Sequence, residues 1–527
     1  MTVPPIAETR AGRVQGRSAP GIELFAEVPY AAPPVGELRF KPPRPVVPWG
    51  GIRPADRWRY RAPQLPDAGH LRAPKKFAAM LGEPYAPALS EDSLTLNVWT
   101  PSSADGRRRP VLFFMHGGGY VFGQAGQPAF DGEAFAGEHD VVFVSVTHRL
   151  NAFGFLYLDQ IAGAEYAGSG NAGLLDLVAA LEWVRDNIAA FGGDPDNVTI
   201  AGESGGAAKV SLLMVMDAAR GLFHRAVCES GFALSAGSAE TANAYALAFI
   251  HELGGTDATV LFDATMEDML AAESRVNPGL SSPLAIGPVV DGVVFTDQPR
   301  ASWEAGHGSP VPLLAGWTLD EVALFSSEDI VADVPIPELF RAGQAEDIPA
   351  GFDPAAGGLA GIEARLGPGV SEVTAVRRSL FPGEPDAVLV RRLLSDIWFR
   401  RPLEQVALLR TLSGGATYLY RFEWASPVLR PLGAPHCAGI ALFFGNDGLV
   451  AFSRDNEAAH ELAGVMSAAL ASFMRYGDPA GAGQVAWPAY GETAREVMIF
   501  DDRVHIARDP EAPLRVALDA LDPVGIM

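Results

Sequence analysis

Strand-like and helix-like stretches alternate along the chain between about residues 110 and 232. Short apolar runs at 111–115, 141–146 and 198–201 are typical of buried strands. After the second run, apolar residues recur three and four positions apart, which predicts an amphipathic helix ending at Gly192 and Gly193. Strands that alternate with helices favour a parallel sheet covered by helices. The apolar stripe of the predicted helix consists of Leu174, Val178, Leu181, Val184, Ile188 and Phe191.

The pattern is weaker beyond residue 232. Helical segments alternate with loops over 240–310 and 330–410, and strand-like runs occur at 311–315 and 417–422. Because no repeat and no low-complexity tract divides the chain, we expect one domain over residues 1–527. Within it, the regions of approximately 232–310 and 325–415 are expected to be helical insertions that form a pocket wall or a lid.

Composition narrows the class of protein. The chain has 527 residues, of which 48% are hydrophobic and 20% charged, so a folded protein is expected rather than a disordered one. Its 40 Lys and Arg residues face 63 Asp and Glu residues, and the net charge of −23 repels phosphate backbones and anionic lipid. We therefore expect neither nucleic acid nor a membrane as a partner.

Cysteine usage and the N-terminal sequence both favour a cytoplasmic protein. Cys228 and Cys437 are the only cysteines, too few for the disulfide framework of a small secreted module. The first residues lack the basic start and apolar run of an export signal. The apolar runs are too short to cross a bilayer core of ~30 Å as helices.

A G-x-S-x-G motif at 202–206 is the strongest chemical signal in the sequence. Ser204 stands between the strand-like run 198–201 and a helix-forming segment that begins at Ala207, which is the context of a serine nucleophile in the α/β-hydrolase fold. The small flanking residues allow the sharp turn that exposes the hydroxyl group. The alternative interpretation is a glycine-rich turn without a catalytic role.

A second glycine-rich segment favours catalysis. The sequence His-Gly-Gly-Gly at 116–119 follows the predicted strand 111–115, and its amides would lie at the carboxyl end of a strand next to Ser204. Backbone amides in that place can stabilise an oxyanion. A phosphate-binding loop is the weaker alternative, because the Gly-Lys-Ser/Thr ending is missing.

A serine nucleophile needs a general base, and in this fold the acid and then the histidine follow the serine in the chain. We prefer His436, which lies in a Pro- and Gly-rich loop after the strand-like run 417–422. For the acid, Asp320 and Glu321 both follow the run 311–315, and spacing alone does not separate them. The histidines downstream of Ser204 are His307, which precedes the acid candidates, His436, His460 in a helical surface context, and His505 at a strand edge.

With these residues in view, the chain resembles the type B carboxylesterase family, which includes para-nitrobenzyl esterases, liver carboxylesterases and cholinesterases. The resemblance spans nearly the whole chain and implies an α/β-hydrolase fold, with a mostly parallel central sheet, flanking helices and helical insertions. The matching segments are 28–40, 91–97, 116–119, 171–176, 202–206, 223–226, 230–231, 320–321, 433–436 and 444–445.

The resemblance assigns roles to individual residues. It implies Ser204 as the nucleophile, Glu321 rather than Asp320 as the acid, and His436 as the base. The remaining implied residues are the oxyanion donors Gly118, Gly119 and Gly205, the neighbours of the site Glu203 and Ser230, and a structural ion pair between Arg39 and Glu91.

Several positions depart from the family pattern. Ala62 and Ser93 stand where many members carry a cysteine pair, which agrees with a reducing compartment. Gly205 stands where alanine is usual after the nucleophile. Gly439 stands where a glutamate commonly follows the histidine, so a carboxylate near the base is expected to be missing. Cys437 is interpreted as a small buried residue without a catalytic role.

The expected function is hydrolysis of a small-molecule carboxylic ester by a Ser-His-Glu triad through an acyl-enzyme, without a metal or an organic cofactor. An amidase or carbamate hydrolase with the same triad is the alternative within enzymes. A non-catalytic, cholinesterase-like binding protein is the alternative outside them. Both a monomer and a small homo-oligomer remain open.

Overall fold

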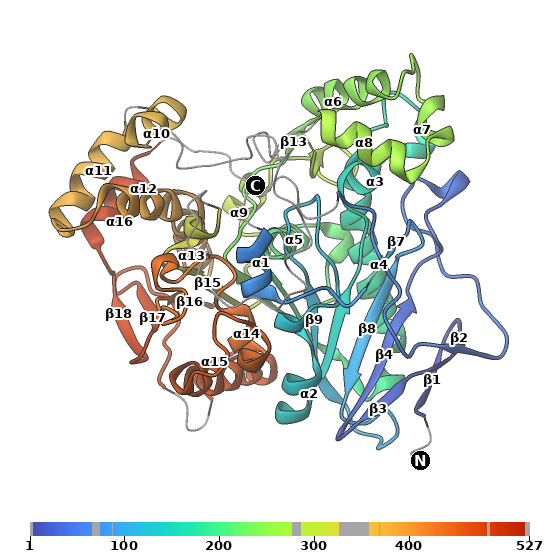
Figure 1. Cartoon of the computed structure of the whole chain (residues 1–527), viewed down its shortest axis with the longest axis horizontal. Helices are drawn as coiled ribbons and strands as arrows, with labels where there is room; N and C mark the ends of the chain where they lie inside the picture. The colour runs from blue at the N-terminus through green and yellow to red at the C-terminus, as the bar shows by residue number, and fades with distance from the viewer. Residues whose placement is uncertain are drawn as a thin grey trace.

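The computed structural model describes residues 4–65, 74–86, 88–276, 286–325, 358–367, 369–481 and 485–521, and a twisted 11-stranded sheet runs through it (Figure 1). The strands from β10 to β17 are parallel, and antiparallel strands extend the sheet at both sides. In sheet order they are β18 (His505–Arg508), β17 (Glu496–Phe500), β16 (Thr417–Phe422), β15 (Leu313–Thr318), β12 (Arg225–Glu229), β11 (Gly193–Glu203), β9 (Arg109–Met115), β10 (Val142–Val146), β8 (Thr95–Thr100), β4 (Ile22–Pro29) and β3 (Arg17–Ala19).

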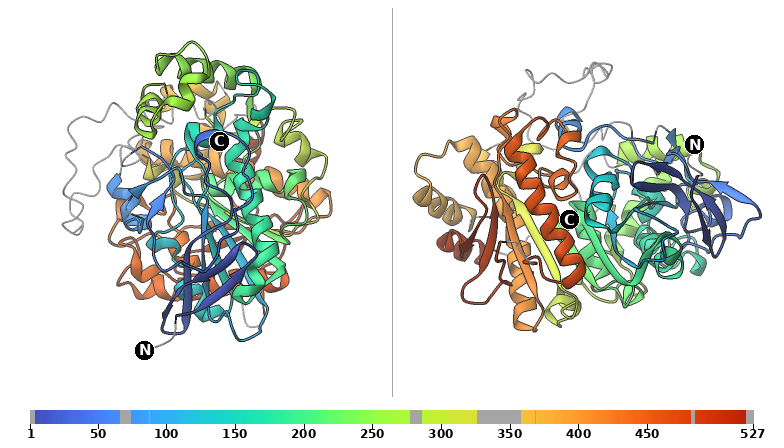
Figure 2. Two further views of the ribbon diagram at one scale, coloured as in Figure 1. Left: turned by 90° about the vertical axis from the view of Figure 1, so that its right-hand side faces the viewer. Right: turned by 90° about the horizontal axis from the view of Figure 1, so that it is seen from below.

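Helices cover both faces of this sheet, because its central strands carry apolar side chains on both sides. Along β9, Val111 and Phe113 belong to one hydrophobic core with α4 (Ala172–Asn187) and α5 (Gly205–Leu213). Leu112 and Phe114 belong to a second core, with α2 (Glu133–His139), α14 (Ile440–Phe443) and α15 (Glu457–Tyr476). The long α15 lies along the sheet (Figure 2, right). The mostly parallel sheet between helices confirms the predicted fold class.

The elements expected between residues 110 and 232 are present. The apolar runs lie in β9, β10 and β11, and the predicted stripe lies on α4. The helix differs from the prediction in its last turn, since Ile188–Phe191 form a 3-10 turn that ends at Gly192 with φ 77°. The runs at 311–315 and 417–422 correspond to β15 and β16.

Both regions that the sequence analysis interprets as insertions contain several helices. The first contains α6 (Ala239–Glu252), α7 (Thr259–Asp263), α8 (Met266–Val276) and α9 (Pro299–Glu304). The second contains α10 (Gly358–Leu366), α11 (Gly369–Leu380), α12 (Asp386–Ser395) and α13 (Arg401–Leu412), and residues 326–357 lie outside the described residues. In Figure 1, α6, α7 and α8 lie at the upper right of the molecule and α10, α11 and α12 at the upper left, while α9 and α13 lie nearer its centre.

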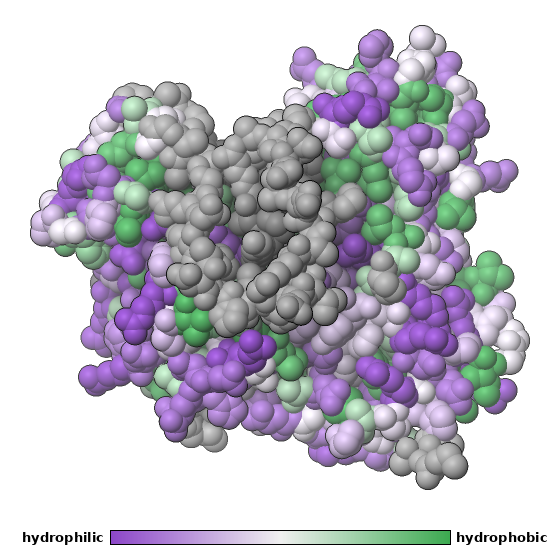
Figure 3. Space-filling model, in the orientation of Figure 1, coloured by the Kyte–Doolittle hydropathy of each residue, from purple (hydrophilic) through white to green (hydrophobic). Residues whose placement is uncertain are grey.

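Smaller elements complete the described chain. No helix within the described ranges is both long and apolar enough to span a membrane. On the face seen in Figure 3, hydrophilic side chains are interspersed with smaller groups of hydrophobic ones. The remaining elements are a three-stranded sheet of β1 (Ile6–Thr9), β2 (Gly12–Gln15) and β5 (Ile52–Pro54), the pairs β6 (Tyr60–Arg61) with β7 (Ala88–Leu89) and β13 (Gly237–Ser238) with β14 (Val289–Val290), and the helices α1 (Pro74–Leu81), α3 (Asn151–Phe155) and α16 (Ala512–Asp519).

Candidate active site

Ser204 occupies a sharp turn between β11 and α5. Its backbone has φ 56° and ψ −122°, a conformation that L residues adopt only where the surroundings impose it. The Ser204 amide donates to the Glu229 carbonyl at 2.9 Å, which ties the turn to the end of β12. A side chain at position 202 would put its Cβ 2.4 Å from the carbonyl carbon of Gly206. The glycines of the motif are therefore required by close packing of the strand against the helix.

His436 reaches this turn from the loop after β16. Its Nδ1 lies 2.5 Å from Oε2 of Glu321, and its Nε2 lies 3.1 Å from Oε1 of Glu203, the residue before Ser204. The rings of Phe325 and Phe399 pack against the imidazole, with centroids 5.1 and 5.2 Å away. Within the described residues, Nε2 makes no hydrogen bond, to Ser204 or to any other group.

Glu321 is held in place by the strand that precedes it. Its Oε1 accepts a hydrogen bond of 2.7 Å from the amide of Thr318, the last residue of β15, and its side chain is fully buried. Asp320 points to other partners: it pairs with Arg392 at 2.6 Å and accepts from the amide of Ala434. The structure thus brings Glu321, and not Asp320, to the imidazole.

The other downstream histidines lie away from this cluster. His307 and His505 are exposed, as is His460, whose Nδ1 lies 3.2 Å from Asp447. His505 lies in the outer strand β18 and His460 in α15, as the sequence predicts. His436, in contrast, is only 1% exposed.

The charges around His436 favour its protonated form. Burial acts to lower the pKa of His436, but the carboxylates of Glu203 and Glu321 outweigh that effect and raise it. For Glu203, burial raises the pKa to about 7, against the opposing influence of His436 and of the hydrogen bond from Cys437. An imidazole between two carboxylates can take up a proton at low cost, which is what a general base must do.

The glycine-rich loop lies directly against the start of α5. Gly118 and Gly119 have φ of 88° and 62°, and a Cβ at position 205 would lie within 2.4 Å of three backbone atoms of Gly119. In the described part of the chain, the amides of Gly118, Gly119 and Gly205 donate to no protein acceptor. Unpaired donors beside a nucleophile are the chemistry of an oxyanion hole.

The sequence analysis missed Glu229, the last residue of β12. A Cβ at position 439 would lie 2.8 Å from Oε1 of Glu229, so a carboxyl group does occupy the surroundings of Gly439, contrary to expectation. Burial, together with Glu203 and Glu321, raises the pKa of Glu229 well above its ordinary value. The next residue, Ser230, has φ 51° and a buried hydroxyl without a described partner. The sequence signal that could have identified Glu229 is its position at the carboxyl end of a strand.

The remaining sequence expectations concern a sulfur atom and an ion pair. Cys228 and Cys437 are both free and buried, and Cys437 Sγ donates to Oε1 of Glu203 at 3.1 Å. Arg39 and Glu91 form the expected pair, with Nε 2.8 Å from Oε2. Arg39 also donates to the carbonyls of Leu261 and Ala264, so the pair fastens the segment around α7.

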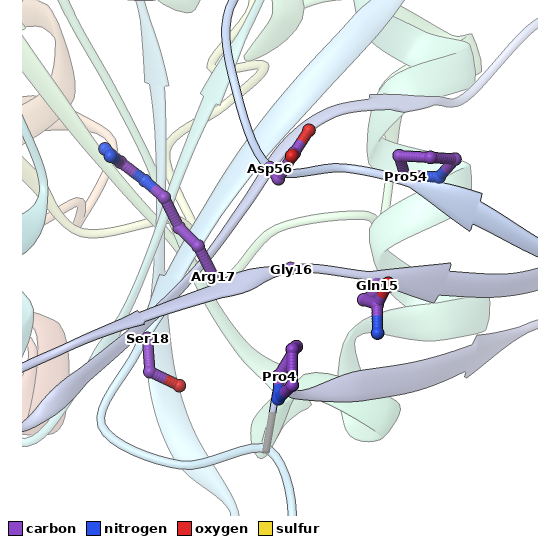
Figure 4. A pocket seen from close by; sticks show the side chains of 7 residues that line it. All are labelled: Pro4, Gln15, Gly16, Arg17, Ser18, Pro54 and Asp56. Carbon is purple, nitrogen blue, oxygen red and sulfur yellow. The ribbon is translucent and has the colours of Figure 1, made fainter. Parts of the chain in front are cut away.

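A surface hollow of about 250 Å³ lies elsewhere, at the N-terminal strands. The side chain of Arg17 extends away from those of Pro4 and Gln15 (Figure 4), and its guanidinium lies 5.2 Å from the ring centroid of Trp58. None of the lining residues belongs to the cluster around His436.

Comparisons with known proteins identify the family of the chain. The model of the carboxylesterase family matches residues 3–513. The chain is 33% identical to the para-nitrobenzyl esterase of Bacillus subtilis, over 97% of this chain and 98% of that one, and 32% identical to the phenmedipham hydrolase of Pseudarthrobacter oxydans, over 99% and 100%. Among solved structures, a carboxylesterase of Geobacillus stearothermophilus superposes with a TM-score of 0.80 at 36% identity, covering 97% of this chain and 99% of that one. The chain therefore belongs to the carboxylesterase family of α/β-hydrolase fold, and it is a serine carboxylic-ester hydrolase.

Proposed function

We propose that the chain hydrolyses small-molecule carboxylic esters through a triad of Ser204, His436 and Glu321. The observation that carries the proposal is the position of the imidazole, with Nδ1 on Glu321 Oε2 at 2.5 Å and Nε2 turned toward the residue before Ser204. A carboxylate at Nδ1 fixes the tautomer whose Nε2 accepts a proton.

The reaction begins when the Ser204 hydroxyl gives its proton to Nε2 of His436 and its oxygen attacks the ester carbonyl. The amides of Gly118, Gly119 and Gly205 hold the oxyanion of the tetrahedral intermediate. The imidazolium then gives its proton to the departing alcohol, which leaves an acyl group on Ser204. Water, activated by the same nitrogen, releases the acid. The rotation of a hydroxyl group brings Ser204 to Nε2 once substrate is bound, since such contacts tighten in the complex.

The protein's own charges support the transition state. Glu321 and Glu203 both face the imidazole; Glu203 is the last residue of β11, and the amide of Thr318 at the end of β15 donates to Glu321. We also propose that the helical regions of about 232–310 and 325–415 form the wall of the substrate pocket of a single catalytic domain.

Variants of the triad test this proposal directly. Ser204→Ala and His436→Ala are expected to lower kcat by at least about 10⁴-fold, and Glu321→Gln by about 10⁴-fold. Asp320→Asn is the matched control, because that carboxylate pairs with Arg392 and should change kcat far less. Ser467→Ala in α15 controls for loss of a buried serine hydroxyl elsewhere. Equal losses in the Asp320 and Glu321 variants would contradict the assignment of the acid.

A covalent label tests the acyl-enzyme step. An organophosphonate should add one mass increment, located by peptide mapping on Ser204 and absent from Ser204→Ala. An unlabelled wild-type protein would instead support a non-catalytic protein. Hydrolysis rates on matched ester, amide and carbamate substrates then show which substrate class is preferred. If the amide or the carbamate is hydrolysed faster, that class replaces the ester as the proposed substrate.

A further inference from the structure

Three different donor atoms meet beside Ser204. The carboxylate of Glu203, Nε2 of His436 and Sγ of Cys437 all lie within 4.8 Å of one another, and all three side chains are buried. Oε1 of Glu203 is 3.1 Å from Nε2 and 3.1 Å from Sγ. The ester hydrolysis proposed above requires no sulfur, so it leaves Cys437 unexplained.

Two of the three donor separations are close to those in the coordination shell of a zinc-like ion. Zn–S bonds are ~2.3 Å and Zn–N and Zn–O bonds ~2.0–2.2 Å, so donors around a tetrahedral ion lie roughly 3.3–3.7 Å apart. The observed 3.1 Å contacts need a change of a few tenths of an ångström. Thiolate, imidazole and carboxylate are also the three donor types that such ions take from proteins.

The imidazole is already oriented as a metal ligand would be. Nδ1 is bound to Glu321, and a carboxylate on the distal nitrogen is the usual support of a histidine that binds a metal through the other. Nε2 is buried, is without a hydrogen bond among the described residues, and faces Glu203 and Cys437. A buried nitrogen that makes no hydrogen bond, although a carboxylate oxygen lies 3.1 Å away, is a second observation, independent of the thiol, that points to a ligand.

We propose that Glu203, His436 and Cys437 form a binding site for a thiophilic divalent cation such as Zn²⁺ or Cd²⁺. On binding, the thiol proton leaves to solvent and a sulfur–metal bond takes its place. The thiolate and the Glu203 carboxylate together balance the charge of the ion. Because the ion occupies Nε2, it also prevents His436 from accepting the Ser204 proton. Inhibition, but not binding, rests on the function proposed above.

Titration with Cd²⁺ alone, on chelator-treated protein, tests the binding site. The wild type should develop the ultraviolet charge-transfer band of a Cd–thiolate bond with one equivalent of metal. Cys437→Ala should lose the band, and Cys228→Ala, the matched buried cysteine of β12, should keep it. Cys437→Ser serves as a second variant if the alanine protein does not fold. A band that survives in both Cys437 variants, or is absent from the wild type, would overturn the proposal.

Ester hydrolysis under Zn²⁺ gives the second readout. Each protein is compared with its own metal-free rate, and the concentration for half inhibition should rise at least about 10-fold in Cys437→Ala, with recovery on addition of chelator. Half inhibition at the same concentration in the wild type and in Cys437→Ala would overturn the inhibitory site. A saturated Cd–thiolate band with unchanged hydrolysis would support the metal site and contradict His436 as the base.

Discussion

The backbone of Gly119 fills the space that a side chain at position 205 would need. In Gly205→Ala, the new methyl group would lie within 2.4 Å of backbone atoms that cannot rotate away, so the glycine-rich loop, the proposed oxyanion hole, must move. We expect kcat to fall by about 10- to 10³-fold, the cost of a misplaced oxyanion donor, with a smaller change in KM.

A glycine with open surroundings controls for this substitution. Gly464→Ala in α15 meets no atom within 4 Å and should leave kcat unchanged. The kinetic comparison is made on an activated ester, with the rate of phosphonate labelling as a second measure. A wild-type value of kcat in Gly205→Ala would mean that the loop accommodates alanine, the residue that is usual at this position in the family. It would also contradict the proposal that close packing against position 205 fixes the position of Gly119.

Lys209 is a fully buried lysine on α5, the helix that begins directly after Ser204. Its Nζ lies 3.4 Å from the His116 carbonyl and 5.6 Å from the ring centroid of Tyr120, and burial lowers the pKa of Lys209 to about 7. The facing imidazoles of His116 and His148 also have pKa values lowered by burial and by Lys209. No carboxylate contributes to the Lys209 shift, so the charged form is held at a cost.

Removing this charge should stabilise the protein in a pH-dependent way. Since the folded pKa lies below that of the unfolded chain, the cost is complete below about pH 7 and vanishes as the pH approaches about 10. Lys209→Met should therefore exceed the wild type in free energy of unfolding by up to about 4 kcal/mol near pH 6, and by little near pH 10. Thermal or urea unfolding across this range measures the difference.

The control for Lys209 is Lys41, a lysine whose pKa is shifted in the opposite direction. The hydrogen bond to Glu165 raises the pKa of Lys41, so Lys41→Met should give no stabilisation near pH 6. An advantage of Lys209→Met that is independent of pH would show that the charge is not its cause.

Among elements, α4 is joined to the loop after β10 by a buried ion pair. Asp176 accepts from Nε of Arg149 at 2.8 Å, from Nη2 at 2.7 Å and from its backbone amide at 3.1 Å. The side chains are 0% and 3% exposed. Asp176→Asn would leave a guanidinium buried without its counter-charge, which costs about 3–5 kcal/mol.

Thermal unfolding measures this cost. For a chain of this length we expect Tm to fall by about 3–5 °C. Asp186→Asn is the control, because its partner Arg10 is 71% exposed and an exposed pair contributes under ~1 kcal/mol. Similar decreases in Tm in the two variants would contradict the larger contribution of the buried pair to stability.

Elements were predictable where one local pattern determines them. The three- and four-residue spacing identified α4, and short apolar runs identified β9, β10 and β11. The 3-10 turn at Ile188–Phe191 was not predictable, because the same stripe continues through it and only backbone geometry distinguishes the two helices. No local sequence pattern indicates that β4 and β8 are antiparallel, because strand direction depends on pairing across the sheet.

The candidate site was predictable to a different degree for each residue. Local motifs pointed to Ser204 and the glycine-rich loop, while the choice of Glu321 over Asp320 needed the family resemblance. The reason is visible in the structure: adjacent carboxylates on one turn reach opposite partners, Arg392 and His436. Glu229 was missed because its proximity to Gly439 joins segments about 210 residues apart in the chain.

On the scale of the whole molecule, the site depends on the parallel arrangement of the central strands. β11, β12 and β15 are neighbours and run in one direction, so Glu203, Glu229 and Glu321 emerge at a single edge. Two of these carboxyl groups, Glu203 and Glu321, raise the pKa of the His436 imidazole, in a protein that carries a net charge of −23. This arrangement favours the protonated imidazole that the transition state requires.

The same arrangement determines when activity can first appear as the chain folds. His436 stands 115 residues after Glu321, which itself lies far beyond Ser204. A chain that ends before His436 contains Ser204 and Glu321 but lacks the proposed base, and contacts between such distant segments form late. Under the proposed triad, hydrolysis therefore reports folding beyond the loop that carries His436: a nascent or truncated chain that ends before His436 would carry a formed serine turn and remain inert toward esters.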